Sequence, residues 1–227
     1  MSGVLDILTQ SGAALFGGHT GEGLELAITI AVQGEVQPKQ VLRKQLTQSG
    51  NCLILTKPIG VGVVFAANML AQANGKLVDE VLSSMLQSNK TAMEIIKRFD
   101  VSGCTDITGF GLLGHAFEML GKDSNNALGI KIDYTAIPVF EGVGELFTKG
   151  YYASIAHTNY ESLSAVLSPE VINKDFPALF DPQTSGGLLF SVPYQKTADC
   201  LKALHQNGVS KACVIGEVID ENKIMIL

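Results

Sequence analysis

Hydrophobic and polar positions along this chain follow two periods, which predicts strands and helices in alternation. The continuous apolar run at 52–56 is typical of a strand buried on both faces of a sheet. Apolar residues at helical spacing predict helices over 63–73, 77–86, 91–99, 141–148 and 194–207. Strands are also predicted over 128–134 and 188–192, with 212–219 and 223–227 paired as a terminal hairpin.

The first 37 residues carry a separate pattern. Residues 4–11 predict a short helix, and 13–16 with 24–32 predict the two strands of a hairpin around a glycine-rich turn. One helix and one hairpin bury too little apolar surface to be stable alone. The stretch 33–37 therefore marks a boundary, after which Pro38 is expected to open a helix that continues to Leu46.

These elements predict an α/β (α+β) fold with a mixed β-sheet flanked by helices. Hydrophobic residues make up 46% of the 227 positions and charged residues 17%, so a well-packed core is expected. The net charge of −6 argues against a general nucleic-acid binder, because such proteins present a clustered basic face. No apolar run is long enough to span a bilayer, and no membrane partner is expected.

The four cysteines form no C-x-x-C pair and have no companion histidines at zinc-ligand spacing. This pattern favours reduced thiols in a cytoplasmic protein. Cys104 lies two residues from Asp106, but a small buried hydrophobe is a better interpretation of it than a catalytic thiol.

Chemistry-bearing residues concentrate at 100–120, DVSGCTDITGFGLLGHAFEML, with Asp106 at the centre. Thr105, Asp106 and Thr108 are residue types that cap helices, and apolar positions then recur at helical spacing. Each of the three glycines in GFGLLG costs roughly 1 kcal/mol relative to alanine in a helix interior. A cost of that size indicates a backbone that another group must approach closely.

Two other interpretations of this stretch compete. The glycines could serve only for close packing, with Asp106 only a helix cap. Residues 109–114 also match the dinucleotide fingerprint G-x-G-x-x-G, with Asp133 at a suitable distance. That fingerprint must follow an apolar strand, and here the polar run SGCTDIT precedes it, which disfavours a Rossmann site.

Four motifs carry a family resemblance: GGHT at 17–20, LTKPIGVG at 55–62, GCTDITGFGLLGHAFEM at 103–119 and LFDPQTSGGLLFSVP at 179–193. In this order they closely resemble selenophosphate synthetase (selenide, water dikinase), of the aminoimidazole ribonucleotide synthetase-related superfamily. The resemblance implies that 38–227 is a C-terminal domain of the aminoimidazole ribonucleotide synthetase type. Residues 1–37 would then be the tail of the N-terminal ATP-binding domain, so the chain is expected to begin part-way through the family's protein.

The resemblance also implies an activity: the intact enzyme makes selenophosphate, AMP and phosphate from ATP, selenide and water, uses Mg²⁺ and forms a homodimer. Asp106 occupies the position of a magnesium-binding aspartate. By residue type alone Gly17-Gly18-His19 is a tight turn, but these three match a turn that contributes to the family's ATP site. The following residues, TGEG, depart from the acidic, proline-containing loop that is usual there.

The family's nucleophile and its other metal ligands have no counterpart before Gly17, so this chain is expected to be inactive alone. The alternatives are a non-catalytic dimerisation or regulatory module of a fusion protein, or another ATP-dependent synthetase of the same superfamily. The sequence leaves open the roles of two motif features, Lys57 and the turn 181–187. Lys57 could meet a phosphate or pair with a carboxylate. The turn 181–187 could cradle an anion with its amides or only set the register of the following strand.

Overall fold

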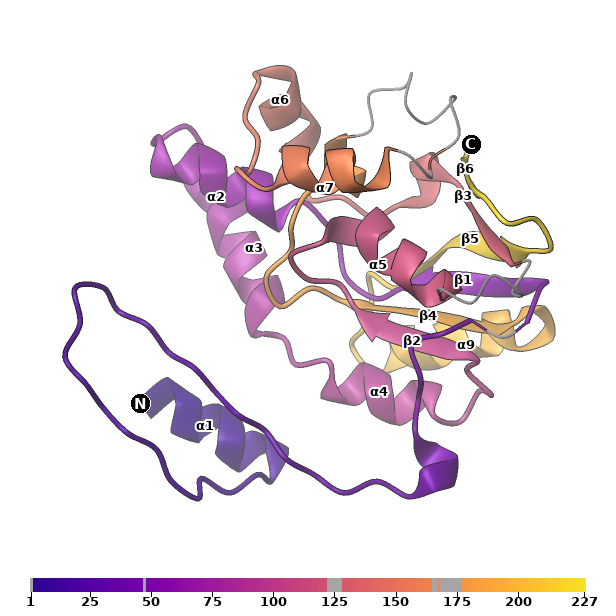
Figure 1. Ribbon diagram of the computed structural model, residues 1–227, viewed down its shortest axis with the longest axis horizontal. Coiled ribbons are helices and arrows are strands. Elements are labelled where there is room, and N and C mark those ends of the chain that lie inside the picture. The colour runs from indigo at the N-terminus through magenta and orange to yellow at the C-terminus, as the bar shows by residue number, and fades with distance from the viewer. Residues whose placement is uncertain (1, 47, 122–127, 165–166, 168–176) are drawn as a thin grey trace. The chain divides into compact units, whose positions relative to one another are not determined.

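The computed structural model describes residues 2–46, 48–121, 128–164, 167 and 177–227 (Figure 1). The chain divides into two compact units, Met1–Val41 and Leu42–Leu227, hereafter unit 1 and unit 2. Each unit is described by itself. Among the described residues, no helix has both the length and the apolar character needed to cross a membrane.

Unit 1 contains the helix α1 (Ser2–Ser11), which confirms the helix predicted near the N-terminus. The predicted hairpin is wrong, because residues 13–37 contain neither helix nor strand. The alternating segment has no second strand in this unit with which to form a ladder, and Leu24, Leu26 and Ile28 are 107%, 94% and 65% exposed. Pro38 opens only a short 3₁₀ helix, η1 (Pro38–Gln40), because the backbone is already extended at Val41.

Unit 2 is built on a mixed six-stranded sheet with the strand order β2-β4-β1-β5-β3-β6. Its strands are β1 (Asn51–Leu55), β2 (Gly103–Asp106), β3 (Gly129–Ile132), β4 (Leu188–Pro193), β5 (Cys213–Ile219) and β6 (Ile224–Ile226). Neighbouring strands are antiparallel except for β3 and β6, which are parallel.

The described helices of unit 2 lie between these strands in the sequence. They are α2 (Val61–Met69), α3 (Gly75–Leu86), α4 (Lys90–Ile96), α5 (Gly111–Leu120), α6 (Val143–Thr148), α7 (Ala156–Leu163) and α9 (Tyr194–Gln206), with 3₁₀ turns η2 (Tyr134–Ala136) and η3 (Pro177–Leu179). The predicted mixed α/β fold is therefore confirmed. The helix α7 lies in a stretch whose sequence shows no clear period.

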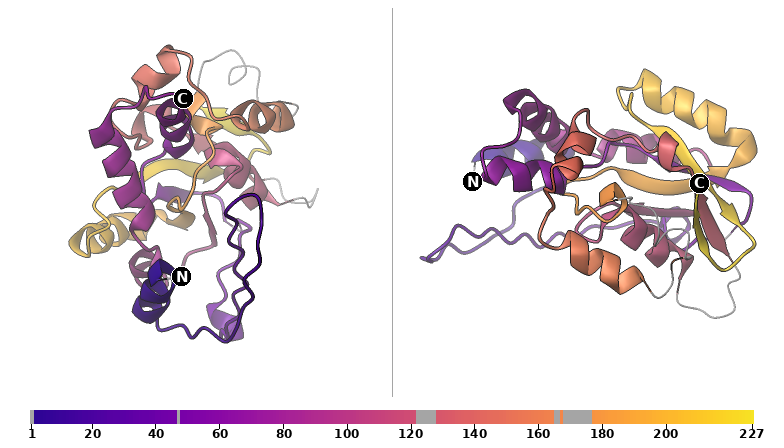
Figure 2. Two further views of the ribbon diagram at one scale, coloured as in Figure 1. Left: turned by 90° about the vertical axis from the view of Figure 1, so that its left-hand side faces the viewer. Right: turned by 90° about the horizontal axis from the view of Figure 1, so that it is seen from above.

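The sheet is packed on both faces, as the apolar run in β1 predicts. Leu53 and Leu55 belong to a core that includes residues of α2, α3 and α5, whereas Ile54 belongs to a second core with α4 and α9. This division follows from the period of two along a strand, which sends successive side chains to opposite faces. Figure 2 shows α9 on one side of the sheet and α5 with α7 on the other.

The predicted terminal hairpin is wrong, although both of its strands exist. β5 pairs with β1 and β3, and β6 pairs with the far edge of β3, with Ile130 opposite Ile224. β3 therefore lies between the last two strands. Gly129 permits this insertion, because a Cβ at that position would lie 1.8 Å from the Glu221 carbonyl oxygen.

Candidate functional site

Asp106 is the last residue of the edge strand β2, where it lies opposite Leu188 of β4. It is exposed, whereas the other three residues of β2 are buried. The prediction that Thr105, Asp106 and Thr108 cap the next helix is wrong. α5 begins only at Gly111, and Phe110, the residue before it, makes no side-chain cap hydrogen bond.

The glycine fingerprint at 109–114 does follow a strand, contrary to the sequence argument. That strand is β2, which pairs antiparallel with β4. A Rossmann site needs a strand, helix and strand unit with parallel strands, so the conclusion against a dinucleotide site holds for a different reason. Gly111 instead allows close packing, since a Cβ there would lie 2.9 Å from the Phe180 carbonyl carbon.

The turn between β2 and α5 is held by His115 from within α5. The backbone N–H of Thr108 donates to His115 Nε2 at 3.0 Å, and the Thr108 hydroxyl oxygen lies 3.0 Å from the same nitrogen. On the other side of the ring, Nδ1 lies 3.0 Å from Glu118 Oε2, which also pairs with Lys44. Burial lowers the pKa of His115, although the neighbouring Glu118 carboxylate acts against that shift.

The loop 181–187 caps the N-terminus of α2 with two side chains. Gln183 Oε1 accepts hydrogen bonds from the backbone N–H groups of Gly60 and Val61, at 3.1 and 3.2 Å. Asp181 Oδ2 accepts from Gly62 N–H at 2.9 Å and from Gln183 Nε2 at 3.0 Å. The first N–H groups of a helix have no acceptor within the helix, so Asp181 and Gln183 of DPQTSGG have a structural function as its cap.

Asp181 is completely buried beneath this cap. Desolvation raises the pKa of its carboxyl from 3.8 to about 7, although the hydrogen bonds from Gln183 and Gly62 act in the opposite direction. Burial has the larger effect on this pKa because the hydration free energy that a carboxylate loses on burial exceeds the free energy that a few hydrogen bonds restore.

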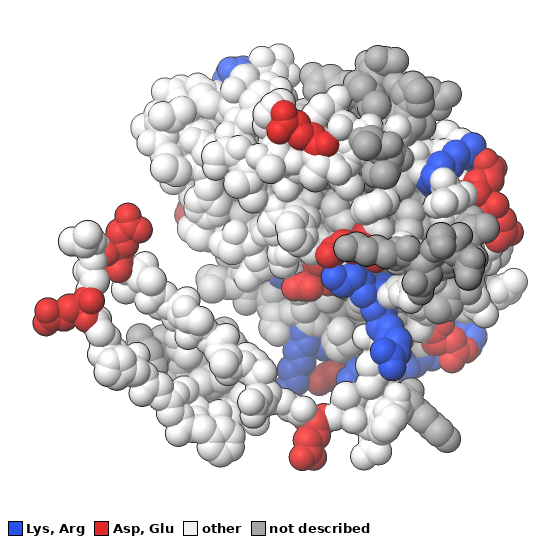
Figure 3. Space-filling model, viewed as in Figure 1, with Lys and Arg blue, Asp and Glu red and all other residues white. Residues whose placement is uncertain are grey.

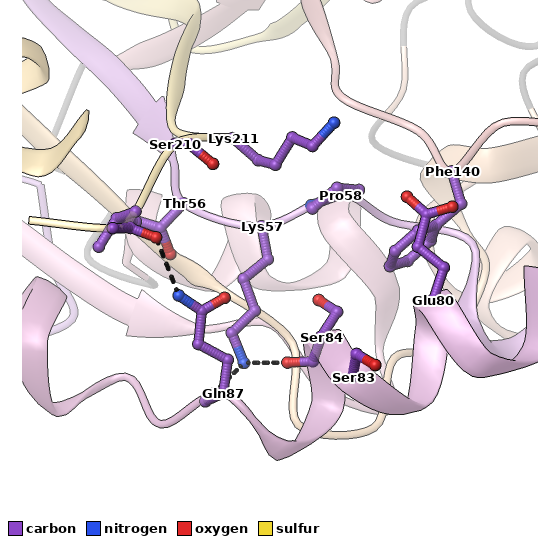
Figure 4. Close-up of a pocket in the computed structure, with 12 residues that line it drawn as sticks. Thr56, Lys57, Pro58, Glu80, Ser83, Ser84, Gln87, Phe140, Ser210 and Lys211 are labelled. Carbon is purple, nitrogen blue, oxygen red and sulfur yellow. Dashed lines mark hydrogen bonds between the residues drawn. The ribbon is translucent and has the colours of Figure 1, made fainter. Parts of the chain in front are cut away.

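Lys57 is fixed by three carbonyl oxygens, and Figure 4 draws Lys57 with Ser84 and Gln87, which supply two of them. Its Nζ donates to the carbonyls of Ser84 at 3.0 Å, Gln87 at 2.7 Å and Ser185 at 2.8 Å. Two of these carbonyls are at the C-terminal end of α3, where a positive charge is favourable. Lys57 is 4% exposed, and burial lowers its pKa. Lys57 Nζ thus donates to backbone carbonyls and pairs with no carboxylate among the described residues.

The three motif loops of unit 2 meet at one end of the sheet. Lys57 follows β1, Thr108 follows β2, and Gly187 precedes β4, their antiparallel neighbour. Ile107 N–H donates to the Gly187 carbonyl at 2.9 Å, and Gln183 N–H donates to the Thr108 carbonyl at 3.0 Å. We call this hydrogen-bonded group of loops, residues 57–62, 106–111 and 181–187, the motif assembly.

Two further features complete the motif assembly. A Cβ at Gly186 would lie 2.2 Å from the Ile107 carbonyl oxygen, so only glycine allows this approach of the loops. Asn159 of α7 donates from Nδ2 to the carbonyls of Gly109 at 2.8 Å and Phe180 at 3.0 Å. No local pattern in the sequence identifies Asn159 as the residue that joins these two carbonyls.

A shallow pocket of about 210 Å³ lies beside Lys57 (Figure 4). Its lining comes from 56–58, α3, Phe140 and the loop 208–211. Several polar groups on it already have partners, since Thr56 Oγ1 accepts from Leu188 N–H and Gln87 Nε2 donates to the Gly208 carbonyl. The pocket is a weaker site candidate than the exposed end of β2.

Charge on the face drawn in Figure 3 is mixed. Acidic and basic side chains of unit 2 lie next to one another there, and no continuous basic area is visible among the described residues of that face. Oppositely charged neighbours form ion pairs in unit 2, such as that between Lys131 Nζ and Glu217 Oε1 at 2.9 Å.

The predicted site residues belong to different units. Gly17, Gly18 and His19 lie in an exposed, irregular part of unit 1, and Asp106 lies in unit 2. Within the part of the chain that the structure describes, no three His, Cys, Asp or Glu side chains gather closely enough to hold a metal ion. Asp106 therefore belongs to no such group of three among the described residues.

The fold and the motif assembly define an α/β domain that presents the exposed carboxylate of Asp106 at the end of an edge strand. The chain belongs to the family described as AIR synthase related protein, C-terminal domain, whose sequence profile matches residues 48–226. Curated relatives extend the similarity to the whole chain.

The selenide, water dikinase of Campylobacter jejuni is 36% identical over 228 aligned positions, which cover 100% of this chain and 65% of that protein. The selenide, water dikinase of Clostridioides difficile is 37% identical over 227 positions, covering 98% of this chain and 64% of the relative. This chain thus spans slightly less than two thirds of the length of these relatives.

Solved structures share the fold at low sequence identity. E. coli HypE, a hydrogenase maturation protein, superposes with a TM-score of 0.57 and 21% identity, over 80% of this chain and 47% of HypE. Thiamine-monophosphate kinase from Stenotrophomonas maltophilia gives a TM-score of 0.55 and 16% identity, over 84% of this chain and 54% of that chain.

Proposed function

We propose that the intact protein containing this chain is a selenide, water dikinase, which makes selenophosphate, AMP and phosphate from ATP, selenide and water. The observation that carries the proposal is the 36% identity to dikinases of that name over the whole chain. The four motifs that resemble the family lie within that match. Unit 2 begins at Leu42 and the family profile at 48, which supports assigning 38–227 to the C-terminal domain and 1–37 to the end of an ATP-binding domain.

Asp106 is proposed as a magnesium ligand of that enzyme. Its carboxylate is exposed at the end of a strand whose other residues are buried, so a metal ion can reach it without rearrangement of the core. Magnesium takes oxygen ligands and bridges one or two carboxylates to substrate phosphates. One carboxylate fits a shared site whose other ligands come from outside the described residues, and for that reason we propose that this chain alone is inactive.

Gly17, Gly18 and His19 are proposed to contribute to the ATP site of the intact enzyme. A Cβ at either glycine would meet nothing within 4 Å, so the backbone of this turn is open to a ligand. A HypE structure in complex with ATP, with a TM-score of 0.50 and 14% identity to this chain, is an example of a related fold that holds this nucleotide.

The intact enzyme is proposed to be a cytoplasmic homodimer. The four thiols are free, as expected in a reducing compartment. The exposed apolar side chains of 24–32 support burial of this segment in the intact protein, because a row of such side chains is a liability in water. Sedimentation of the intact enzyme as a monomer contradicts the dimer.

The deciding experiment is ³¹P NMR of selenophosphate formation by the intact protein with ATP, selenide and Mg²⁺. We expect product from the wild type and a loss of about a hundredfold or more in rate for Asp106→Asn. Asp199→Asn, which changes an exposed carboxylate on α9, is the matched control and should retain activity. Full activity of Asp106→Asn contradicts the metal role, and absence of product from the wild type favours a non-catalytic module.

A further inference from the structure

The His115 side chain is almost enclosed at the start of α5, with 5% of its surface exposed. One ring nitrogen faces the turn that follows Asp106, and the other faces Glu118. Phe110 covers part of the ring, with its centroid 5.5 Å from that of the imidazole. The ring is therefore in a defined environment on both edges.

The contacts of His115 define its tautomer. A backbone N–H can only donate, so Nε2, which accepts the Thr108 N–H at 3.0 Å, must carry a lone pair. The ring proton is then on Nδ1, which lies 3.0 Å from Glu118 Oε2 without the alignment of a hydrogen bond, so the geometry at Nε2 alone assigns the tautomer. A doubly protonated ring would present a hydrogen to the Thr108 N–H and lose this acceptor.

The charged groups around the ring oppose one another. Glu118 and Asp106 favour the protonated ring, whereas Lys44 and above all burial favour the neutral one, and the net effect lowers the pKa of His115. A neutral acceptor at Nε2 is consistent with this balance.

Thr108 is held from two directions. Its N–H is bound by His115, and its carbonyl accepts from Gln183 N–H at 3.0 Å and Gly111 N–H at 3.1 Å. On the preceding side, Ile107 N–H is bound to the Gly187 carbonyl at 2.9 Å. His115 therefore supplies one of these four hydrogen bonds that hold the backbone immediately after Asp106, and the only one of them whose acceptor is a side chain.

We propose that His115 is a positioning residue: its neutral imidazole, protonated on Nδ1, accepts the Thr108 N–H and holds the turn so that Asp106 presents its carboxylate for metal binding. The metal part of this inference rests on the proposed function of Asp106. The part that concerns the tautomer and the turn does not.

The first test is the ring tautomer, measured by ¹⁵N NMR on the histidine-labelled 227-residue chain at neutral pH. His205 is an internal reference, because its Nε2 lies 2.7 Å from the Ala212 carbonyl oxygen and must donate. We expect His115 to be protonated on Nδ1 and His205 to carry a proton on Nε2. An Nε2-protonated or doubly protonated His115 overturns the proposal.

The second test compares His115→Gln with His115→Asn. The longer glutamine side chain can place its amide oxygen near the original Nε2, whereas the asparagine oxygen reaches only about as far as Nδ1. We expect hydrogen exchange at the Thr108 amide to stay slow in the Gln variant and to become faster in the Asn variant. Equal exchange in the wild type and both variants overturns the proposal.

The third measurement is Mn²⁺ affinity of the intact protein by electron paramagnetic resonance. We expect His115→Gln to retain the affinity and His115→Asn to lose about tenfold, as for other residues that orient a metal ligand. His157→Asn, which changes an exposed histidine of α7, is the control and should bind as the wild type does. Equal losses in the Gln and Asn variants mean a packing role and overturn the positioning role.

Asp106→Asn separates the two proposals. If this variant binds Mn²⁺ as tightly as the wild type does, the proposed metal role of Asp106 is wrong. The tautomer of His115 and the exchange of the Thr108 amide then still decide whether His115 holds the turn.

Discussion

The buried carboxyl of Asp181 should make the stability of this protein fall as the pH rises. Its folded-state pKa is raised from 3.8 to about 7 by burial under the α2 cap. Between these two values the unfolded chain has released the proton that the folded chain still holds, and the folded state is progressively penalised. The contribution of the protonated Asp181 carboxyl to the free energy of unfolding is fully present below pH 3.8. It is lost as the pH rises to about 7. The perturbation to test is Asp181→Asn, which removes the titrating group and keeps an acceptor for Gly62 N–H.

The magnitude follows from the separation of the two pKa values. One pKa unit corresponds to about 1.36 kcal/mol, so the whole shift amounts to about 4 kcal/mol. Between about pH 5 and about pH 8 the share lost is about 2.5 kcal/mol, because the folded carboxyl has itself ionised near the upper end. Across that pH interval, the free energy of unfolding of the wild type should fall by this amount relative to that of Asp181→Asn.

The assay is urea denaturation followed by far-UV circular dichroism, at the two pH values for both proteins. Titration of all other groups is common to both and cancels in the comparison. Asp133→Asn is the control, because the Thr135 hydroxyl lowers the pKa of that exposed carboxyl, whose contribution is therefore constant above its unfolded pKa of 3.8. Identical pH dependence in the wild type and Asp181→Asn, or a greater gain of the wild type at high pH, would refute the reasoning.

Two further predictions concern the motif assembly, both measured by urea denaturation. Lys57→Met removes three hydrogen bonds to carbonyls and should cost about 3 kcal/mol, whereas the exposed Lys211→Met should change stability by less than about 0.5 kcal/mol. A small effect of Lys57→Met means that water replaces the ammonium group. Gly186→Ala places a Cβ 2.2 Å from the Ile107 carbonyl oxygen and should cost about 3 kcal/mol, but Gly144→Ala, in α6 with nothing within 4 Å, should stabilise by up to about 0.5 kcal/mol. Equal effects of the two alanine substitutions contradict the close approach.

Local pattern predicted most elements of unit 2 correctly. β1, α3, β4 and α9 occur within a few residues of their expected bounds, because their apolar positions repeat with one clear period. β2 was not predicted as a strand, and the residues expected to cap α5 lie before its observed start. A four-residue edge strand that ends in an aspartate and precedes a glycine turn has no period of its own.

Pairing of strands was harder to predict than their existence. The last two strands look like a hairpin in sequence, but β3 enters between them and bonds to both. The prediction of a hairpin in unit 1 failed for a related reason. Residues 24–32 alternate like a strand, but no other segment of that unit pairs with them. A strand's pattern determines which side chains share a face, whereas its hydrogen-bond partners depend on segments distant in the chain.

The candidate site shows the same division. Asp106 and its glycine-rich turn could be recognised from residue types, and the resemblance suggested their chemistry. The roles of Lys57, Asp181, Gln183 and His115 became evident only in the folded structure, where Lys57 binds carbonyls, Asp181 and Gln183 cap α2, and His115 holds Thr108.

The sequence by itself therefore determined the periods of its elements, the mixed α/β class and the family that its motifs resemble. Only the tertiary structure decided the strand order and the convergence of three loops at one end of the sheet. The physical reason is that periodicity is a property of neighbouring residues, whereas backbone carbonyls and N–H groups are the same at almost every position. The local sequence therefore does not determine which of these backbone groups a buried polar side chain contacts.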